Sequence, residues 1–201
     1  MEKIKLGPQT LFYPAVALIG ATVNEKPNFM TVSWCGTGAR KPAAVTFPMN
    51  KFRYTLKGIR DNGTFSVNIA SCDIAKKADY CGIYSGKNRD KSKIFKIFYG
   101  LLKTAPLIQE CHLNMECKAI HYVDLGSHTL IIGEVVETYL DEDCLVDGKA
   151  DFQKIDPLIY ASPSMKYYRL GEIIAPAFEI GKESHDERPP KSVLADCLNG
   201  R

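Results

Sequence analysis

The sequence predicts a mainly β protein with short helices, folded as one predominantly antiparallel barrel. Six or more segments show the β-branched, aromatic and alternating character of strands. The helical segments are short and do not alternate with the strands as a βαβ protein requires. At 201 residues without an internal repeat, the chain has the length of one domain. We therefore expect a single domain over residues 1–180, followed by a polar arm or tail over 181–201.

The expected elements follow one another along most of the chain. Strands are expected over residues 13–23, 29–35, 43–47, 64–70, 111–123, 126–141, 158–162 and 166–170, with turns at 24–28, 124–127 and 163–164. Asn50 is a good N-cap for a helix that ends at 61–63. This helix would place Phe52, Leu56 and Ile59 on one face. A second helix is expected over 73–81, and the basic segment 80–100 should be a loop leading into a short helix.

Composition and charge narrow the classes of function. A net charge of +3 is mild for a nucleic-acid binder, since such proteins concentrate basic charge on one face. No apolar stretch has the length of a membrane span, and the N-terminal apolar run lacks a signal-peptide cleavage pattern. We expect a cytoplasmic protein without membrane or nucleic-acid partners. The seven cysteines include no C-x-x-C pair and are expected to be reduced thiols.

A polar strand face and a basic helix start indicate a phosphorylated aromatic ligand. Residues 29–35 alternate, and the second face carries Thr31, Ser33 and Cys35, so it is either solvent-facing or lines a polar pocket. Lys51 and Arg53 fall in the expected first helical turn. Cations there oppose the helix dipole, so a negative group such as a phosphate is expected beside them.

Other kinds of chemical site are not supported by the spacing of residues. The Gly-Thr-Gly at 36–38 lacks the third glycine of a dinucleotide fingerprint, and no P-loop is present. Cys111, Cys117 and His121 share one strand face, but Cys111 and His121 would lie about 33 Å apart, too far to share a metal ion. No nucleophile elbow or protease-like cysteine signature occurs. We therefore predict neither a metal site nor a catalytic residue.

Several segments, taken in order, resemble the flavin reductase-like, FMN-binding split-barrel family, most closely its flavoredoxin type. They are PNFMTVSW (27–34), FRYT (52–55), FSVN (65–68), YCGIYSGKNRDK (80–91) and GSHTLIIGEV (126–135), and the resemblance runs from about residue 12 to 172. It implies an antiparallel split β-barrel that binds FMN. It also implies a homodimer with the flavin near the subunit interface.

The resemblance also implies roles for individual residues. Trp34 would lie beside the isoalloxazine, with Asn28 at the pocket edge, and Tyr160 could lay its ring against the flavin. Cys35 is expected to be a small residue packed under the cofactor, with a reactive nucleophile as the alternative. The loop with Ser85 and Lys91 would close over the phosphate and ribityl chain. His128 could contact the flavin or a partner subunit, but Ser127 stands where family members often have aspartate, which leaves a proton relay unsupported. The complete predicted cofactor-binding set is Asn28, Thr31, Ser33, Trp34, Cys35, Arg53, Thr55, Ser85, Lys91, His128 and Tyr160.

Simpler structural roles compete with these assignments. Trp34 could be an ordinary core residue, Thr55 could bond to its own helical turn, and Arg53 could form a surface salt bridge.

Three functions remain open at this stage. The first is an FMN protein that carries electrons to a redox partner protein or reduces flavin with NAD(P)H. The second is a split-barrel oxidoreductase with a specific organic substrate. The third is a barrel that binds single-stranded nucleic acid, because aromatic and lysine residues interleave in KIFKIFYG (93–100).

Overall fold

The computed structural model describes residues 14–183. The chain divides into two compact units, Met1–Leu170 and Gly171–Arg201. The division falls before the predicted boundary at residue 180. In the second unit the described part contains one short 3-10 helix, η4 (Ile180–Glu183). The tail beyond residue 183 lies outside the described residues.

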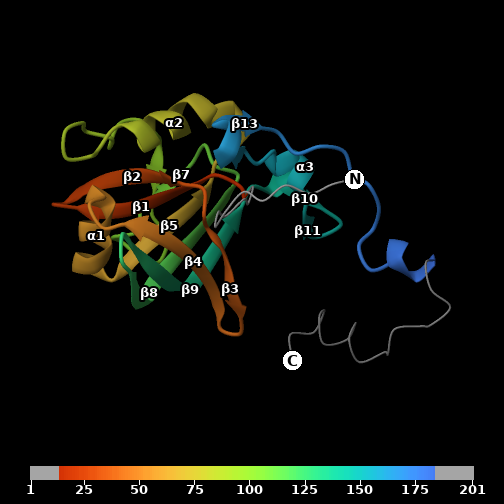
Figure 1. Cartoon of the computed structure of the whole chain (residues 1–201), viewed down its shortest axis with the longest axis horizontal. Helices are drawn as coiled ribbons and strands as arrows, with labels where there is room; N and C mark the ends of the chain where they lie inside the picture. Colours follow the sequence, from red (N-terminus) through yellow and green to blue (C-terminus); the bar gives the residue numbers. More distant parts are fainter. Residues whose placement is uncertain (1–13, 184–201) are drawn as a thin grey trace, which may run out of the picture. The chain divides into compact units, whose positions relative to one another are not determined.

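One seven-stranded antiparallel sheet dominates the first unit (Figure 1). Its strands are β1 (Ala17–Val23), β2 (Lys26–Val32), β3 (Gly36–Arg40), β4 (Ala43–Asn50), β5 (Thr64–Ile69), β8 (Leu113–Leu125) and β9 (His128–Leu140). They lie in the order β2-β1-β5-β8-β9-β4-β3, so β2 and β3 are the two edges. The predicted mainly β, antiparallel split barrel is confirmed.

The inner face of the curved sheet encloses the main core together with one helix. Helix α1 (Tyr54–Asn62) contributes Leu56 and Ile59 to this core and ends at Gly63, whose φ of 66° suits glycine. The sheet residues of the core are Ala17, Ile19, Ala21, Met30, Val32, Val45, Phe47, Met49, Phe65, Val67, Cys117 and Ile131. Their period of two along each strand explains why the alternating pattern predicted these strands.

A second helix covers the other face of β1 and β2. Helix α2 (Ala75–Ile83) follows the 3-10 turn η1 (Cys72–Ile74), and its Ala78 and Cys81 pack with Leu18 and Phe29. The hydroxyl of Thr31 donates a hydrogen bond to the carbonyl of Ala78. Figure 1 shows α2 running beside β2, which places the polar face of this strand against the helix.

Shorter elements complete the first unit. They are β6 (Ile97–Phe98), β7 (Leu107–Ile108), η2 (Glu142–Cys144), β10 (Leu145–Val146), β11 (Lys149–Ala150), α3 (Phe152–Ile155), β12 (Ile159–Ala161), η3 (Ser162–Ser164) and β13 (Lys166–Tyr168). Strands β12 and β13 form the predicted last hairpin. The buried carboxylate of Glu116 accepts hydrogen bonds from the backbone N–H groups of Leu101 and Leu102 and from the Tyr139 hydroxyl, which fixes the loop before β7. No helix within residues 14–183 is long and apolar enough to cross a membrane.

The helix after Asn50 begins later than predicted. Asn50 ends β4 and its side chain accepts a hydrogen bond from the Phe52 N–H, while Arg53 occupies the N-cap position. Phe52 is therefore outside the helix and 95% exposed, not on its apolar face. Lys51 pairs at 2.7 Å with Asp124 near the end of β8, so its negative partner is a side chain of the chain itself.

Two other expectations about secondary structure were wrong. Strand β4 does not stop at Pro48 but continues to Asn50 in its pairing with β9. Proline is tolerated there because β3 pairs with β4 only as far as Thr46, so no N–H of residue 48 is needed for pairing with β3. The basic segment leads into the two-residue strand β6, not a short helix, and Phe95 within it is buried against the α2 side of the sheet.

Candidate functional site

The candidate site lies where the barrel is split. Strand β2 ends at Val32 and β3 begins at Gly36, so Ser33, Trp34 and Cys35 link the two sheet edges. Three adjoining cavities open along this link, and we call them together the groove. The polar cavity (about 340 Å³) is lined by Val16, Thr31, Ser33, Arg53, Asp79, Gly82, Tyr160, Met165 and Tyr167. The central cavity (about 190 Å³) is lined by Met30, Thr31, Val32, Ser33, Trp34, Pro48, Asn50, Arg53 and His128, and the apolar cavity (about 800 Å³) by Pro14, Trp34, Cys35, Gly36, Thr37, Thr46, Pro48, Leu125 and His128.

The cationic part of the groove is formed by Arg53. This residue lines both the polar and the central cavity, together with the hydroxyl-bearing Thr31 and Ser33. Its Nη1 donates a 3.2 Å hydrogen bond to the carbonyl of Gly82 in the last turn of α2. A guanidinium carries five N–H donors in a planar fork that suits a phosphate. Arg53 thus supports the C-terminal end of α2 while lining a cavity.

The aromatic part of the groove is formed by Trp34 and His128. Their ring centroids lie 5.9 Å apart, and both rings line the central and the apolar cavity. Trp34 is 48% exposed, so it is not the core residue that the simpler interpretation expected. The Nδ1 of His128 lies 2.8 Å from the hydroxyl of Ser127, which takes the place of the missing aspartate as a partner for this ring.

Three predicted ligands form a buried cluster beside the groove. The Asn28 amide donates a 2.7 Å hydrogen bond to the hydroxyl of Thr55, and both side chains are buried. Lys91 is also buried, and its ammonium donates to the carbonyls of Phe29 and Cys81 at 3.0 and 2.8 Å. Burial lowers the pKa of Lys91. These polar atoms already have partners within the protein, so contact with a ligand requires rearrangement or sharing of these bonds.

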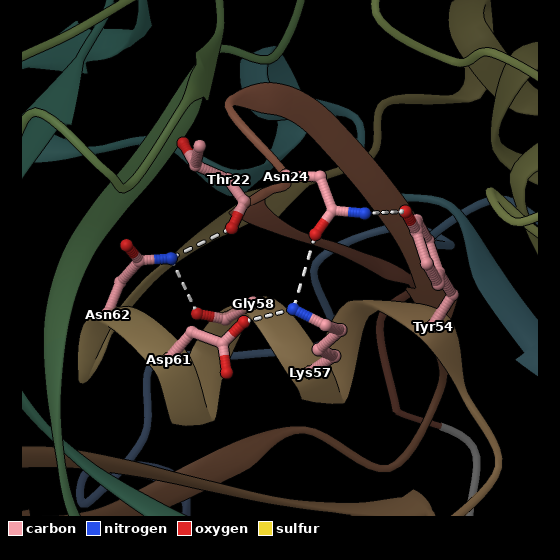
Figure 2. A network of polar contacts seen from close by, with 7 residues as sticks. All are labelled: Thr22, Asn24, Tyr54, Lys57, Gly58, Asp61 and Asn62. Atoms are coloured by element: carbon pink, nitrogen blue, oxygen red, sulfur yellow. Dashed lines mark hydrogen bonds and ion pairs between the residues drawn. The ribbon is translucent and has the colours of Figure 1, made fainter.

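A further cavity of about 380 Å³, the basic cavity, lies beyond this cluster. It is lined by Lys26, Lys87, Arg89 and Lys91, with Val23, Asn24, Pro27, Asn28, Tyr54, Gly86, Asn88 and Asp90. One of its walls is held by the network in Figure 2, in which Asn24 donates to the Tyr54 hydroxyl and accepts from Lys57. Asn62 of α1 donates to the carbonyl of Thr22, so this network ties α1 to the β1–β2 hairpin.

Ser85 lies apart from the other predicted residues. It is exposed, lines none of these four cavities, and accepts hydrogen bonds within its own loop from Lys87, Asn88 and Arg89. The structure therefore does not bring Ser85 to the groove.

Cys35 packs against the main core and also lines the apolar cavity. Burial raises its pKa to about 12, so the thiol is protonated at neutral pH. Because β2 ends at Val32, Cys35 does not continue the face of Thr31 and Ser33 as the alternating pattern predicted.

The hairpin β12–β13 supplies a wall of the groove that was only partly predicted. Tyr160 lines the polar cavity, and its ring centroid lies 5.5 Å from that of Tyr167. The Tyr167 hydroxyl donates a 2.8 Å hydrogen bond to Asp79 of α2. Burial, followed by this contact with Asp79, raises the pKa of Tyr167. Asp79 and Tyr167 were missed because 88 residues separate them and no local pattern joins them.

The groove therefore gathers seven of the eleven predicted residues, and the rest of the set lies beside it or apart. Those in the groove are Thr31, Ser33, Trp34, Cys35, Arg53, His128 and Tyr160. The groove runs from a part with a cation, hydroxyls and tyrosines to a part with a half-exposed indole and an imidazole. It can hold an elongated ligand that is anionic at one end and aromatic at the other.

Comparisons with known proteins relate most of the chain, including the groove, to flavin proteins. The profile of the flavin reductase-like domain matches residues 11–168. The structure resembles flavoredoxin from Methanosarcina acetivorans, with 38% identity and a TM-score of 0.88 over 92% of this chain and all of that one. It also resembles flavoredoxin of Desulfovibrio vulgaris (Miyazaki F), with 38% identity and a TM-score of 0.83 over 90% of this chain and 100% of that one. A ferric-chelate reductase (NAD(P)H) of Archaeoglobus fulgidus is 27% identical over 115 residues, which are 56% of this chain and 67% of the relative.

Proposed function

This chain belongs to the flavin reductase-like domain family, and on this premise we propose that it binds FMN in the groove and transfers electrons from NAD(P)H. The family membership confirms the resemblance inferred from sequence and brings with it a flavin cofactor and a function of the flavin reductase and flavoredoxin type. The observation that carries the FMN assignment is the pairing, in one groove, of the Arg53 cation with the Trp34 and His128 rings.

The residues of the groove fit the chemistry of FMN. The phosphate of FMN requires charged and hydrogen-bonding donors, which Arg53 and Ser33 supply at the polar cavity, while the neighbouring Thr31 hydroxyl donates to Ala78. The flavin ring requires an aromatic or apolar wall, which Trp34 and His128 supply. Asn28, Thr55 and Lys91 would hold the phosphate or ribityl chain from the adjoining buried cluster.

The protein needs few reactive groups for this function. When bound, a flavin supplies hydride and electron transfer itself, and the protein positions it and tunes its surroundings. The groove contains no thiol with a lowered pKa among the described residues, and Cys35 stays protonated. Holding the ring and leaving part of it accessible is therefore the main task of these side chains.

Assembly and electron partners belong to the same proposal. We place the protein in the cytoplasm as a homodimer with the flavin near the subunit interface. Phe52 is 95% exposed between Asn50 and Arg53, which line the central cavity, so it offers an apolar contact for a second subunit. NAD(P)H as donor is supported by the ferric-chelate reductase relative, and a redox partner protein by the flavoredoxin neighbours.

A spectroscopic experiment tests the proposed function. The purified protein, saturated with FMN and freed of excess, should show flavin absorption that bleaches when NADH or NADPH is added without oxygen. Bleaching with dithionite or a reduced partner protein but not with either nucleotide would exclude NAD(P)H as donor and favour an electron carrier. A protein that retains no flavin would refute the FMN assignment.

Arg53→Gln tests the phosphate end of the groove. The loss of charge-assisted hydrogen bonds should weaken FMN binding about 10- to 100-fold, corresponding to roughly 1.5–3 kcal/mol. Arg60→Gln is the matched control, because Arg60 lies on the same helix and stacks over the Tyr122 ring, away from the cavity linings. Equal FMN affinity in the two variants, measured by quenching of flavin fluorescence, would contradict the role of Arg53.

A further inference from the structure

The apolar cavity is larger than the rest of the groove and has a different chemistry. Its volume of about 800 Å³ falls in the usual range of sites for small organic ligands. Trp34, Pro48 and Leu125 give it apolar walls, and Leu125 is 55% exposed at the end of β8. A cavity with these walls gains from burying an apolar ligand surface.

Charged groups are missing from the described lining of this cavity. The other parts of the site carry charge, with Arg53 and Asp79 at the polar cavity and three lysines and an arginine at the basic cavity. The apolar cavity has hydroxyls, one imidazole and one thiol. Burial keeps the Cys35 thiol protonated by raising its pKa to about 12. A phosphate or carboxylate would have no lysine or arginine as a partner in this lining, so an anionic ligand is disfavoured.

The cavity adjoins the place proposed for the flavin ring. Trp34, Pro48 and His128 line both the central and the apolar cavity. A flat ring bound in the apolar cavity would therefore share its wall with the cofactor. This position separates the cavity from the phosphate end of the groove at Arg53.

We infer that the apolar cavity binds an uncharged, planar, conjugated oxidant of the quinone class. This inference rests on the proposed function and names the electron acceptor. In the overall reaction, the reduced nicotinamide gives up a hydride, water supplies one proton, and the quinone leaves as the hydroquinone. His128 and the hydroxyls of Thr37 and Thr46 are the lining groups that can hydrogen-bond to quinone oxygens.

The intrinsic fluorescence of Trp34 gives a direct test of binding. This residue is the only tryptophan of the chain and lines the cavity, so a quinone bound there should quench its emission. Duroquinone is a suitable probe because its fully substituted ring does not add thiols. Titration of the flavin-free protein should show saturable quenching after correction for absorbance. In the protein saturated with FMN, where the neighbouring flavin itself quenches Trp34, equilibrium dialysis should show that duroquinone is still bound.

The outcomes of the two binding measurements separate the quinone inference from the proposed FMN function. Binding of duroquinone and FMN together supports the inference. The absence of saturable quenching, or displacement of duroquinone by FMN, would overturn it while leaving the proposed function intact. If duroquinone bound but FMN did not, the proposed function would fail and the acceptor role with it.

A pair of leucine variants locates the ligand. Leu125→Asp places a charge in the wall of the cavity and should weaken duroquinone binding at least tenfold, and by more than it weakens FMN binding. Leu101→Asp is the control, since Leu101 is similarly exposed at 65% and does not line the groove. Equal affinities of the two variants for duroquinone would overturn the assignment to this cavity.

Discussion

Replacing Lys91 with methionine tests whether its buried ammonium group holds the folded chain together. The side chain is only 3% exposed and donates to the carbonyls of Phe29 and Cys81. Cys81 lies in the last turn of α2, where carbonyls lack helical partners, and Phe29 lies on β2 at the edge of the sheet. Lys91 therefore joins a helix end to a sheet edge through two carbonyls that those elements leave without a regular partner.

The size of the effect follows from these two contacts. A hydrogen bond to a charged group contributes about 1.5–3 kcal/mol, so removing both costs roughly 3–6 kcal/mol. Burial lowers the pKa of Lys91, which shows that desolvation opposes its charge, and methionine does not carry that cost. We expect Lys91→Met to lower the free energy of unfolding by about 2–4 kcal/mol.

Urea unfolding followed by circular dichroism, without added flavin and under reducing conditions, measures this loss. Lys87→Met is the matched control, because Lys87 is exposed on the same loop and should change the free energy of unfolding by less than about 0.5 kcal/mol. If Lys91→Met and Lys87→Met unfolded at the same urea concentration, the structural role of Lys91 would be refuted. FMN titration of both variants would then show whether Lys91 serves only as the predicted ligand.

Three further predictions concern stability. Burial raises the pKa of Cys35 from 9.0 to about 12 in the folded protein, so its stabilising contribution is fully present below pH 9 and is lost as the pH rises toward 12. Urea unfolding across this range should show a smaller alkaline loss in Cys35→Ala than in the wild type, by up to about 1.4 kcal/mol per pH unit, and equal slopes would contradict the assignment. Glu116→Gln should destabilise the fold by about 2–4 kcal/mol, because an amide cannot accept all three hydrogen bonds that the carboxylate receives; an unchanged thermal midpoint would refute this. Gly86→Ala should cost about 1–3 kcal/mol, because its Cβ would overlap the Asn28 side chain, whereas Gly36→Ala has open space and should be neutral; equal melting temperatures for the two would show that the loop adapts.

Local sequence patterns determined most of the secondary structure. Alternation predicted that Phe65 and Val67 share the core face of β5, and the helical period predicted that Leu56 and Ile59 face the core from α1. Gly63 ends α1 in the left-handed conformation expected of a helix stop. These features depend on neighbours within a few residues, so periodicity and turn chemistry are enough to predict them.

Features that depend on distant segments were missed or misplaced. The path of β4 through Pro48 depends on where its pairing with β3 ends. The pairing of Lys51 with Asp124 depends on the registers of both β4 and β8 with β9. The alternation of residues 29–35 was extended too far, since the strand stops at Val32.

The residues of the groove were likewise predicted in part from the sequence and placed in part only by the tertiary structure. The sequence by itself, through its resemblance to a family, determined which residue types and which flavin chemistry to expect, and seven of the predicted residues line the groove. Only the tertiary structure showed that Lys91 and Thr55 are engaged in internal hydrogen bonds and that Tyr167 meets Asp79. The physical reason is the order of the strands in the sheet, which leaves β2 and β3 as its two unpaired edges. The residues that link these edges meet groups from α2, β9 and the β12–β13 hairpin, which lie far away in the chain.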